Sequence, residues 1–459
     1  MVNDKKIFRL KHYVTHRSPA EILIFGFAAV ILIGALLLTL PISSASGRSP
    51  GFLNALFTAT SAVCVTGLVV VDTGTFWSLF GKLIIITLIQ IGGLGFMSLT
   101  TMFFVLAGKR ITIKDRLLIQ SSVNTDSISG IVKFTKYIFF SSIGIELIGA
   151  LFLSMVFIPE FGFSKGIAYS IFHAISAFCN AGFDLMGNFT SLTRYVDNFL
   201  VNFVIGGLII FGGLGFAVTS DILYIRKFHK MTMQAKLVLV ITGGLLLLGF
   251  VLFFIFEYNN PRTMGNLSLN GKILASFFQS VSPRTAGFNT VDMAGLTKPS
   301  LFLTMLLMFV GASPGSTGGG VKTTTIGIII LTVASVLNGK KDVIALKRTI
   351  TGPAIRRAIS VVVIAMVIII VMMFVLLCSE PDLSFESILF EVLSASGTVG
   401  LSMGITPYLS ISGKLALIIT MFVGRLGPLT VAYAISRNEK RLKENIGSFK
   451  LPDGNIMIG

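Results

Sequence analysis

The sequence predicts an all-α polytopic membrane protein with four parallel helix–pore loop–helix repeats around a central pore, a channel-like architecture. The composition is 53% hydrophobic and 12% charged, whereas soluble domains carry about 25% charged residues. Four glycines recur, each directly after a short apolar segment: Gly67, Gly182, Gly287 and Gly400. This recurrence indicates a fourfold repeat. Positive charge gathers between the repeats, which gives all four the same orientation.

The first helix of each repeat is a long apolar run. We expect these helices over residues 20–42, 135–158, 236–256 and 357–378. A membrane-spanning helix needs about 20 residues, and each run is long enough. The first run is too long for a signal-peptide core and no cleavage site follows cleanly, so we expect it to be retained. Continuously apolar runs also exclude a membrane β-barrel, whose strands alternate.

A short apolar segment and the glycine loop follow. The short segments cover residues 52–64, 168–179, 272–282 and 384–396. They cannot cross a membrane, so they must enter and return, which is tolerated only where the backbone is buried or lines water. The second long helices are expected over residues 78–106, 197–224, 299–337 and 412–436. The prediction is therefore eight membrane-spanning helices and four re-entrant pore helices.

The net charge of +17 is distributed unevenly. Most Lys and Arg residues fall in five segments before, between and after the repeats: 1–19, 107–136, 225–236, 338–357 and 437–459. Basic loops between apolar spans mark the cytoplasmic side, so both termini are expected there and the glycine loops on the external side. No polar stretch is long enough for a folded nucleic-acid-binding module, so we expect no nucleic acid partner.

These elements divide the chain into six parts. The division is a cytoplasmic basic N-terminus at 1–19, repeats at 20–110, 131–226, 235–338 and 355–437, and a cytoplasmic tail at 438–459. Because two crossings per repeat return the chain to the same side, the repeats are parallel, which disfavours the inverted repeats of many secondary carriers.

The glycine loops are predicted to bind a cation through backbone carbonyls. Glycine adopts conformations that other residues avoid, and the short helix before it directs its negative C-terminal end toward the ion. The predicted ligands are Cys64, Val65, Thr66, Gly67, Cys179, Asn180, Ala181, Gly182, Arg284, Thr285, Ala286, Gly287, Gly397, Thr398, Val399 and Gly400. Their side chains vary, which suits a site made of backbone. For any one glycine, a plain helix-breaking turn is the alternative. The residues alone predict a monovalent cation pore.

The chain resembles the Trk/Ktr/HKT superfamily of potassium transporters, most closely the membrane, ion-translocating subunit of Ktr-type uptake systems. The resemblance covers nearly the whole chain, and its most specific motifs are residues 61–68 (SAVCVTGL), 282–289 (SPRTAGFN) and 397–402 (GTVGLS). It implies one filter glycine per loop. Serine at the first of these glycines is associated with Na⁺ passage in plant relatives. Because Gly67 stands here, the resemblance implies K⁺ as the transported ion, with Na⁺ as a candidate activator.

A glycine-rich break interrupts the second helix of the third repeat. Five glycines and one proline between residues 311 and 321 cannot hold a regular helix. Apolar runs flank the break, so it lies at membrane depth, where it must border protein or water. The predicted gate residues are Gly311, Ala312, Ser313, Pro314, Gly315, Ser316, Thr317, Gly318, Gly319 and Gly320. A structural hinge is the alternative, and the resemblance supports an intramembrane gate loop.

Buried charges add two hypotheses. The motif Gly-x-Leu-Gly recurs in the other second helices, and Arg425 occupies the place of Gly93 and Gly213. A charge at this depth is costly, so we predict that Arg425 contacts the gate loop; snorkelling to the inner headgroups is the alternative.

Arg284 and Glu391 are predicted to pair and brace the filter, or else to face the external vestibule.

Partners and rival functions complete the predictions. No nucleotide-binding motif, catalytic set or metal-ligand spacing is present, so we expect no enzyme activity and no cofactor in this chain. The resemblance implies a homodimer on a cytosolic nucleotide-binding, RCK-like regulatory ring, in the cell (plasma) membrane. The basic loops are expected to contact membrane lipids. The apolar tail is free or tucks into the dimer interface.

A Na⁺- or H⁺-coupled secondary cation carrier is the alternative function, with Glu146 as its only mid-span acidic residue.

Overall fold

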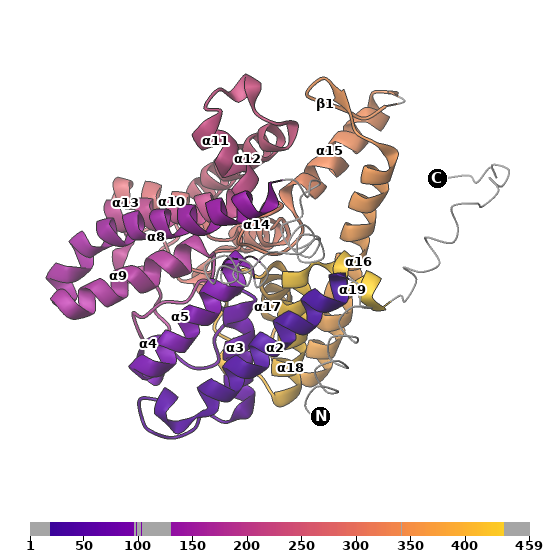
Figure 1. Ribbon diagram of the computed structural model, residues 1–459. Helices are drawn as coiled ribbons and strands as arrows, with labels where there is room; N and C mark the ends of the chain where they lie inside the picture. Colours follow the sequence, from indigo (N-terminus) through magenta and orange to yellow (C-terminus); the bar gives the residue numbers. More distant parts are fainter. Residues whose placement is uncertain (1–18, 96–97, 99–101, 103–129, 341, 436–459) are drawn as a thin grey trace.

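The computed structural model describes residues 19–95, 98, 102, 130–340 and 342–435 (Figure 1). Residues 1–18 of the expected N-terminal segment 1–19, most of the basic segment 107–136 and the tail 438–459 lie outside the described residues. The described part of the chain is helical, apart from one short hairpin.

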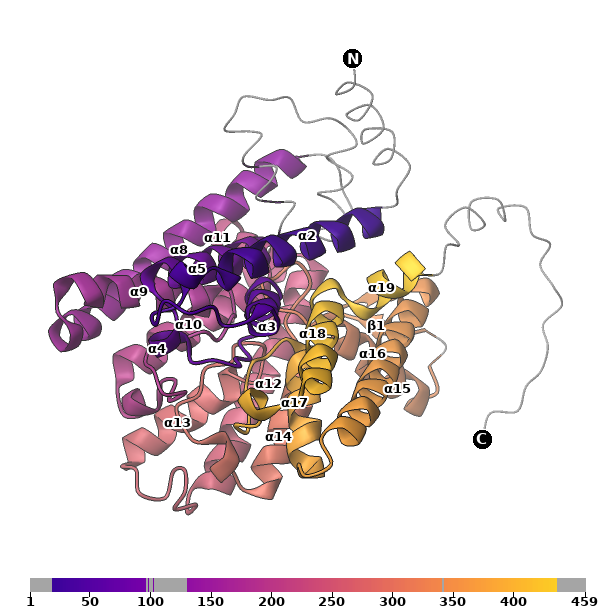
Figure 2. The ribbon, with the colours of Figure 1, turned by 90° about the horizontal axis from the view of Figure 1, so that it is seen from below.

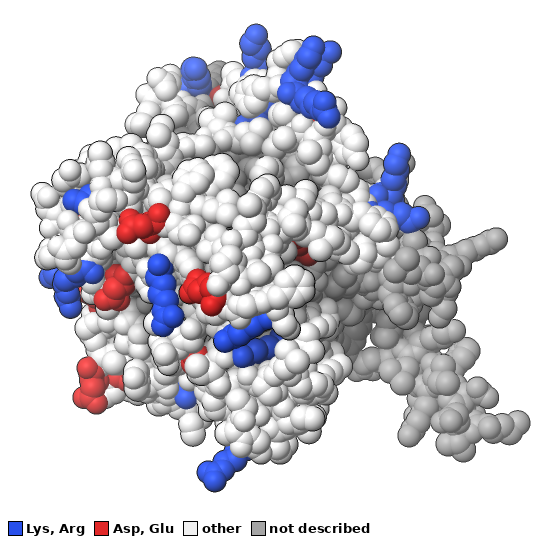
Figure 3. Space-filling view, turned by 90° about the vertical axis from the view of Figure 1, so that its left-hand side faces the viewer, with Lys and Arg blue, Asp and Glu red and all other residues white. Residues whose placement is uncertain are grey.

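The long apolar runs form the four expected first helices. They are α2 (Pro19–Thr39), α8 (Ile131–Phe161), α12 (Met233–Glu257) and α16 (Gly352–Ser379). Each is individually long and apolar enough to cross a membrane. Large side chains on them are exposed, for example Phe25 at 54%, Leu151 at 66% and Leu247 at 66%. Apolar side chains exposed on these helices suit contact with lipid, and on the face drawn in Figure 3 the charged side chains are scattered over a largely uncharged surface.

The four short segments form helices that end close to the predicted residues. They are α3 (Phe52–Val63), α9 (Phe163–Phe178), α13 (Leu269–Val281) and α17 (Phe385–Gly397). The Ser268 and Ser384 hydroxyls cap α13 and α17 by accepting the backbone N–H of Gly271 and Ser387. Helix α9 begins five residues earlier than predicted because only Gly162, at φ +81°, separates it from α8.

The second helices of the second, third and fourth repeats are broken, whereas continuous helices were expected over 197–224 and 412–436; of the helix expected over 78–106, most residues after Gly95 lie outside the described residues. The second helices of all four repeats comprise α5 (Leu79–Leu94), α10 (Phe199–Leu214), α11 (Phe216–Tyr224), α14 (Lys298–Phe309), α15 (Thr323–Leu337), α18 (Ile411–Leu426) and α19 (Pro428–Ile435). Gly95, Gly215 and Gly427 end α5, α10 and α18 with φ of +82°, +93° and +88°. A helix cannot continue through a left-handed residue, and α11 is bent by 105° from α10. Among the described residues, the predicted break at 311–321 is longer than those at Gly215 and Gly427.

The repeats pack in a closed circuit. Each second helix contacts the short helix of the next repeat: α5 on α9, α10 on α13, α14 on α17, and α18 back on α3. In Figure 1 the coloured segments follow one another around the centre of the molecule. This circuit brings the four glycine loops together in the middle.

The remaining elements are short. They are η1 (Pro41–Ser43), α4 (Thr73–Phe76), η2 (Thr193–Tyr195), η3 (Phe228–Lys230), η4 (Met293–Gly295), η5 (Thr406–Tyr408), β1 (Ile344–Ala345) and β2 (Arg348–Thr349). The antiparallel pairing of β1 with β2 was not predicted. Its turn residues Leu346 and Lys347 are both left-handed, at φ +49° and +65°, as in a two-residue hairpin turn of the primed type. That turn usually contains Asn-Gly, and no such signal is present here.

Candidate functional site

The four predicted glycines form a ring. A Cβ atom built on each glycine would contact the backbone oxygen of the residue before the next glycine: Gly67 to Ala181 at 2.5 Å, Gly182 to Ala286 at 2.8 Å, Gly287 to Val399 at 2.6 Å and Gly400 to Thr66 at 2.0 Å. The order runs through repeats 1, 2, 3 and 4 and closes on repeat 1. A side chain at any of the four positions would therefore displace the neighbouring loop.

The loop backbones share an alternating conformation. The four glycines have φ between +70° and +96°. Two residues before each glycine stands another left-handed residue: Val65 (φ +56°), Asn180 (+59°), Thr285 (+71°) and Thr398 (+50°). Left-handed backbone at a non-glycine residue costs about 1–3 kcal/mol and persists where the surrounding structure fixes it. Alternating handedness turns neighbouring carbonyl groups toward one side, the arrangement used by carbonyl-lined cation sites.

Four buried serines hold these loops and were not predicted. They are Ser61, Ser176, Ser282 and Ser394. In the first and fourth loops the hydroxyl oxygen accepts the N–H of the ring glycine, at 3.0 Å in both cases. In the second and third loops the hydroxyl donates to the carbonyl of the phenylalanine after the glycine, at 2.7 Å for Phe183. A serine five or six residues before every ring glycine is the sequence signal that could have identified them.

The loop 311–321 lies directly against the ring. The Gly319 N–H donates to Thr398 Oγ1 at 3.1 Å, and a Cβ on Gly318 would lie 2.2 Å from Thr285 Oγ1. Both threonines are the left-handed residues of their loops. The glycines at 318 and 319 thus allow the loop to approach the ring more closely than any side chain would permit.

The same loop is hydrogen-bonded to the second repeat, and its two ends are hydrogen-bonded to each other. Thr317 donates its N–H to Gly212 O at 3.2 Å and its hydroxyl to Phe178 O at 3.1 Å. Where the two ends of the loop meet, the Gly311 N–H donates to Val321 O at 2.9 Å. The loop therefore contacts the second, third and fourth repeats at once.

Two cationic side chains donate to the loop carbonyls. The Arg425 guanidinium donates to Thr317 O and, on the opposite side, to Gly92 O of α5. The Lys322 ammonium donates to Gly318 O at 2.7 Å, with Gly319 O at 3.4 Å. Through Arg425 the loop is also tied to the first repeat. Lys322 was not predicted; a lysine two residues after a glycine run at membrane depth is the signal that could have identified it.

The expected pairing of Arg284 with Glu391 is wrong. Arg284 is 7% exposed and its guanidinium contacts Thr242 Oγ1 at 3.4 Å. Glu391 is fully buried and accepts hydrogen bonds from the hydroxyls of Ser402 and Thr406. The hydrogen bonds of each charge go to neutral hydroxyls of its own repeat, and Arg284 Nε and Glu391 Oε2 have no hydrogen-bond partner.

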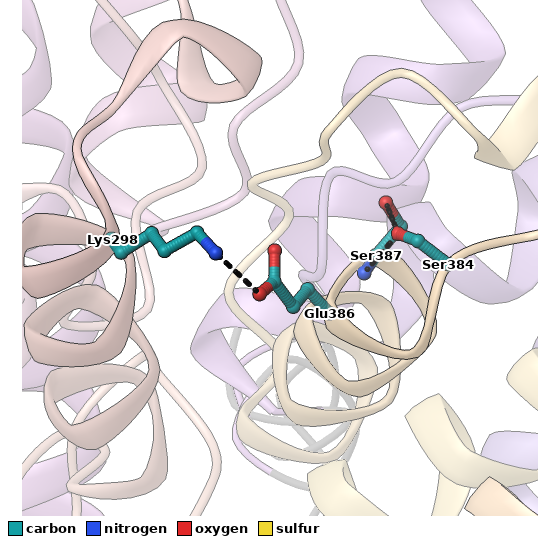
Figure 4. A network of polar contacts seen from close by, with 4 residues as sticks. All are labelled: Lys298, Ser384, Glu386 and Ser387. Carbon is teal, nitrogen blue, oxygen red and sulfur yellow. Dashed lines mark hydrogen bonds and ion pairs between the residues drawn. The ribbon is translucent and has the colours of Figure 1, made fainter.

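Among the described residues, one ion pair joins the third and fourth repeats, and it lies elsewhere. Lys298 Nζ lies 3.9 Å from Glu386 Oε1, between exposed side chains at the start of α14 and α17 (Figure 4). An exposed pair of this kind contributes little to stability.

Comparison with known proteins agrees with this architecture. Residues 6–442 match the family model TrkH, described as a cation transport protein. The chain is 44% identical over 445 residues to the potassium/sodium uptake protein NtpJ of Enterococcus hirae, covering 96% of this chain and 97% of the relative. It is 43% identical over 444 residues to the Ktr system potassium uptake protein B of Bacillus subtilis, covering 96% and 97%.

The fold is similar to a solved structure. The crystal structure of the potassium transporter TrkH from Vibrio parahaemolyticus aligns with a TM-score of 0.73 and 17% identity, covering 92% of this chain and 86% of that one. The family model spans nearly the whole chain, and the chain therefore belongs to the TrkH family of cation transport proteins.

Proposed function

We propose that the protein takes up K⁺ across the cell membrane through the ring of Gly67, Gly182, Gly287 and Gly400, as the membrane subunit of a Ktr-type system. The observation that carries the proposal is the closed ring, in which each glycine adjoins the carbonyl of the next loop. K⁺ is the proposed ion because the 43% identical relative is named a potassium uptake protein and the 44% identical relative a potassium/sodium uptake protein.

The filter acts through backbone carbonyls. Carbonyl oxygens replace the hydration shell of a cation without needing any one side chain, which fits loops whose side chains differ. The short helices α3, α9, α13 and α17 direct their negative ends toward the ring, which favours a cation there. The serine contacts hold each loop at a fixed distance from its helix.

The loop 311–321 acts as the gate below the filter. It lies against two filter loops, so a passing ion requires its displacement. Arg425 and Lys322 occupy the carbonyl groups of residues 317–319 with fixed positive charge, which both holds the loop and opposes a mobile cation at that level.

The topology follows from the charge pattern. The four long first helices and the four second helices cross the membrane as eight spans, and the four short helices are re-entrant. The basic segments lie on the cytoplasmic side with both termini, so the ring is nearer the external side.

Regulation comes from other chains. The Bacillus subtilis relative is named as part of a Ktr system, which supports further system components here. We propose a homodimer on a cytosolic nucleotide-binding ring, with no cofactor in this chain. Na⁺ is the proposed activator, supported by the potassium/sodium name of the Enterococcus relative.

The test is uptake in a bacterial strain that lacks its own K⁺ transporters. Expression of this chain with its regulatory partner should restore growth at low K⁺ and saturable K⁺ uptake, and uptake should increase with external Na⁺. No restoration despite normal protein levels in the membrane would contradict the proposal.

A Na⁺- or H⁺-coupled carrier is the second candidate, favoured by one observation. Glu146 is buried within α8, a helix that crosses the membrane, and intramembrane acids often bind coupling ions. Purified protein in vesicles distinguishes the two candidates. A channel passes K⁺ current that reverses at the K⁺ equilibrium potential, whereas a carrier shows a reversal potential that shifts with the Na⁺ or H⁺ gradient.

A further inference from the structure

A buried amide–carboxylate pair lies behind the second glycine loop. Glu146 of α8 is 5% exposed. The Gln90 Nε2 of α5 donates toward both carboxylate oxygens, at 3.1 Å each. Polar groups at this depth are costly and persist when they act on a pathway or hold another element. The pair joins the first repeat to the second.

The pair reaches the filter through Cys179. The Cys179 Sγ donates to Gln90 Oε1 at 3.5 Å and lies 4.0 Å from Glu146 Oε1. Cys179 is fully buried and directly follows α9, and its carbonyl is the first of the four predicted ligands in that loop. The next residue, Asn180, is left-handed, so movement of Cys179 changes the direction of the carbonyls that follow.

Helix α5 leaves no space around this contact. A Cβ on Gly93 would lie 2.6 Å from Cys179 Sγ, so the backbone of α5 approaches the start of the loop directly. Helices α5, α8 and α9 lie side by side (Figure 1 and Figure 2). The pair therefore acts between tightly packed elements, and its loss would be transmitted to the loop.

The equivalent place between the second and third repeats is built differently. Arg284 stands three residues before its ring glycine, as Cys179 does. Together with Ile210 and Thr242 it lines a small cavity, and its Nε has no hydrogen-bond partner there. The dense contact of an amide, a carboxylate and a thiol is thus a feature of the second loop that the fourfold repeat does not require.

We propose that Gln90 and Glu146 are positioning residues that hold Cys179 and thereby set the cation discrimination of the second filter loop. This inference rests on the proposed function of the glycine ring. A carbonyl-lined site discriminates K⁺ from Na⁺ through the number and placement of its oxygens, so release of one loop should lower selectivity more than it lowers the maximal rate of uptake.

The test measures the K⁺/Na⁺ preference of uptake in three variants. Gln90→Leu removes the donor to the carboxylate and the acceptor for the thiol, and should lower the preference about fivefold, as expected when a hydrogen bond worth about 1 kcal/mol is lost. Glu146→Gln, which is isosteric, should lower it less. The exchange Gln90→Glu with Glu146→Gln rebuilds one amide–carboxylate pair and should restore the preference to within about twofold of the parent.

Controls separate this inference from misfolding and from the proposed function. Thr87→Val on α5 and Ser154→Ala on α8 alter exposed hydroxyls that bond only to their own helices, and should leave the preference unchanged. Unchanged preference in both single variants, or an exchange no better than Gln90→Leu, would overturn the inference. If Gly67→Ser lowers the K⁺/Na⁺ preference and the Gln90 and Glu146 variants do not, only the positioning role of these two residues is wrong. If Gly67→Ser also has no effect, the filter proposal fails with it.

Discussion

Replacement of Arg425 by alanine should open the gate in part. The guanidinium donates to Thr317 O of the loop and to Gly92 O of α5, so it links the loop to the first repeat. A hydrogen bond to a charged group contributes about 1.5 kcal/mol or more. Loss of the bond to Thr317 O therefore destabilises the closed loop by about 1.5 kcal/mol, which corresponds to about a 10-fold shift of the closed-to-open equilibrium.

The assay is ⁸⁶Rb⁺ flux into vesicles that contain the purified membrane subunit without its regulatory partner. Arg425→Ala should raise the flux, and Arg425→Lys should raise it less because one donor group remains. Deletion of Ser316–Gly319 should raise it further, since it also removes the contacts to Thr285 and Thr398. Some preference for K⁺ should persist, because the glycine ring is untouched.

Arg262→Ala, which alters an exposed arginine outside the loop, serves as the matched control and should leave the flux unchanged. The reasoning is refuted if the deletion variant reaches the membrane, elutes as a folded protein and conducts no better than the parent. The loop would then be a hinge or a packing element.

Three further outcomes are expected. Lys322→Met should raise partner-free Rb⁺ flux, because Gly318 O loses its cationic donor; a flux equal to the parent's would remove Lys322 from the gate. Ser394→Ala should lower the thermal unfolding temperature in detergent and the K⁺/Na⁺ preference, since the Gly400 N–H loses a buried acceptor worth about 1 kcal/mol, and an unchanged preference would contradict a role in the filter. Arg284→Met and Glu391→Gln should have additive effects on unfolding free energy, within about 0.5 kcal/mol, because the two charges have separate partners; a larger interaction energy would restore the pairing hypothesis.

The helices and the ring could be predicted because their signals are local. Hydropathy sets the long helices, as for α12, and the length of a segment such as 384–396 shows that it cannot span a membrane. The recurrence of glycine after four such segments then gives the register of the ring. Each of these inferences needs only the order of residues along the chain.

The helix ends at Gly95, Gly215 and Gly427 and the supporting contacts could not be predicted in the same way. A glycine in an apolar helix, such as Gly215 or Gly427, serves close packing or a left-handed end equally well, and only the tertiary structure selects between them. The neutral partners of Arg284 and Glu391 come from positions distant in sequence or from loops of unknown path. A buried charge without a visible partner therefore suggested an ion pair that the fold does not make.

The most direct test of the filter is the K⁺/Na⁺ preference of Gly67→Ser. Gly67 has φ of +96°, and a Cβ there would lie 2.5 Å from Ala181 O of the next loop, so serine must move a carbonyl of the ring. Gly144→Ser, at a helix position with open space around the Cβ, is the control and should behave as the parent. The account predicts a clear fall in K⁺/Na⁺ preference for Gly67→Ser at normal membrane levels. An unchanged preference at those levels would contradict the assignment of the glycine ring as the selectivity filter.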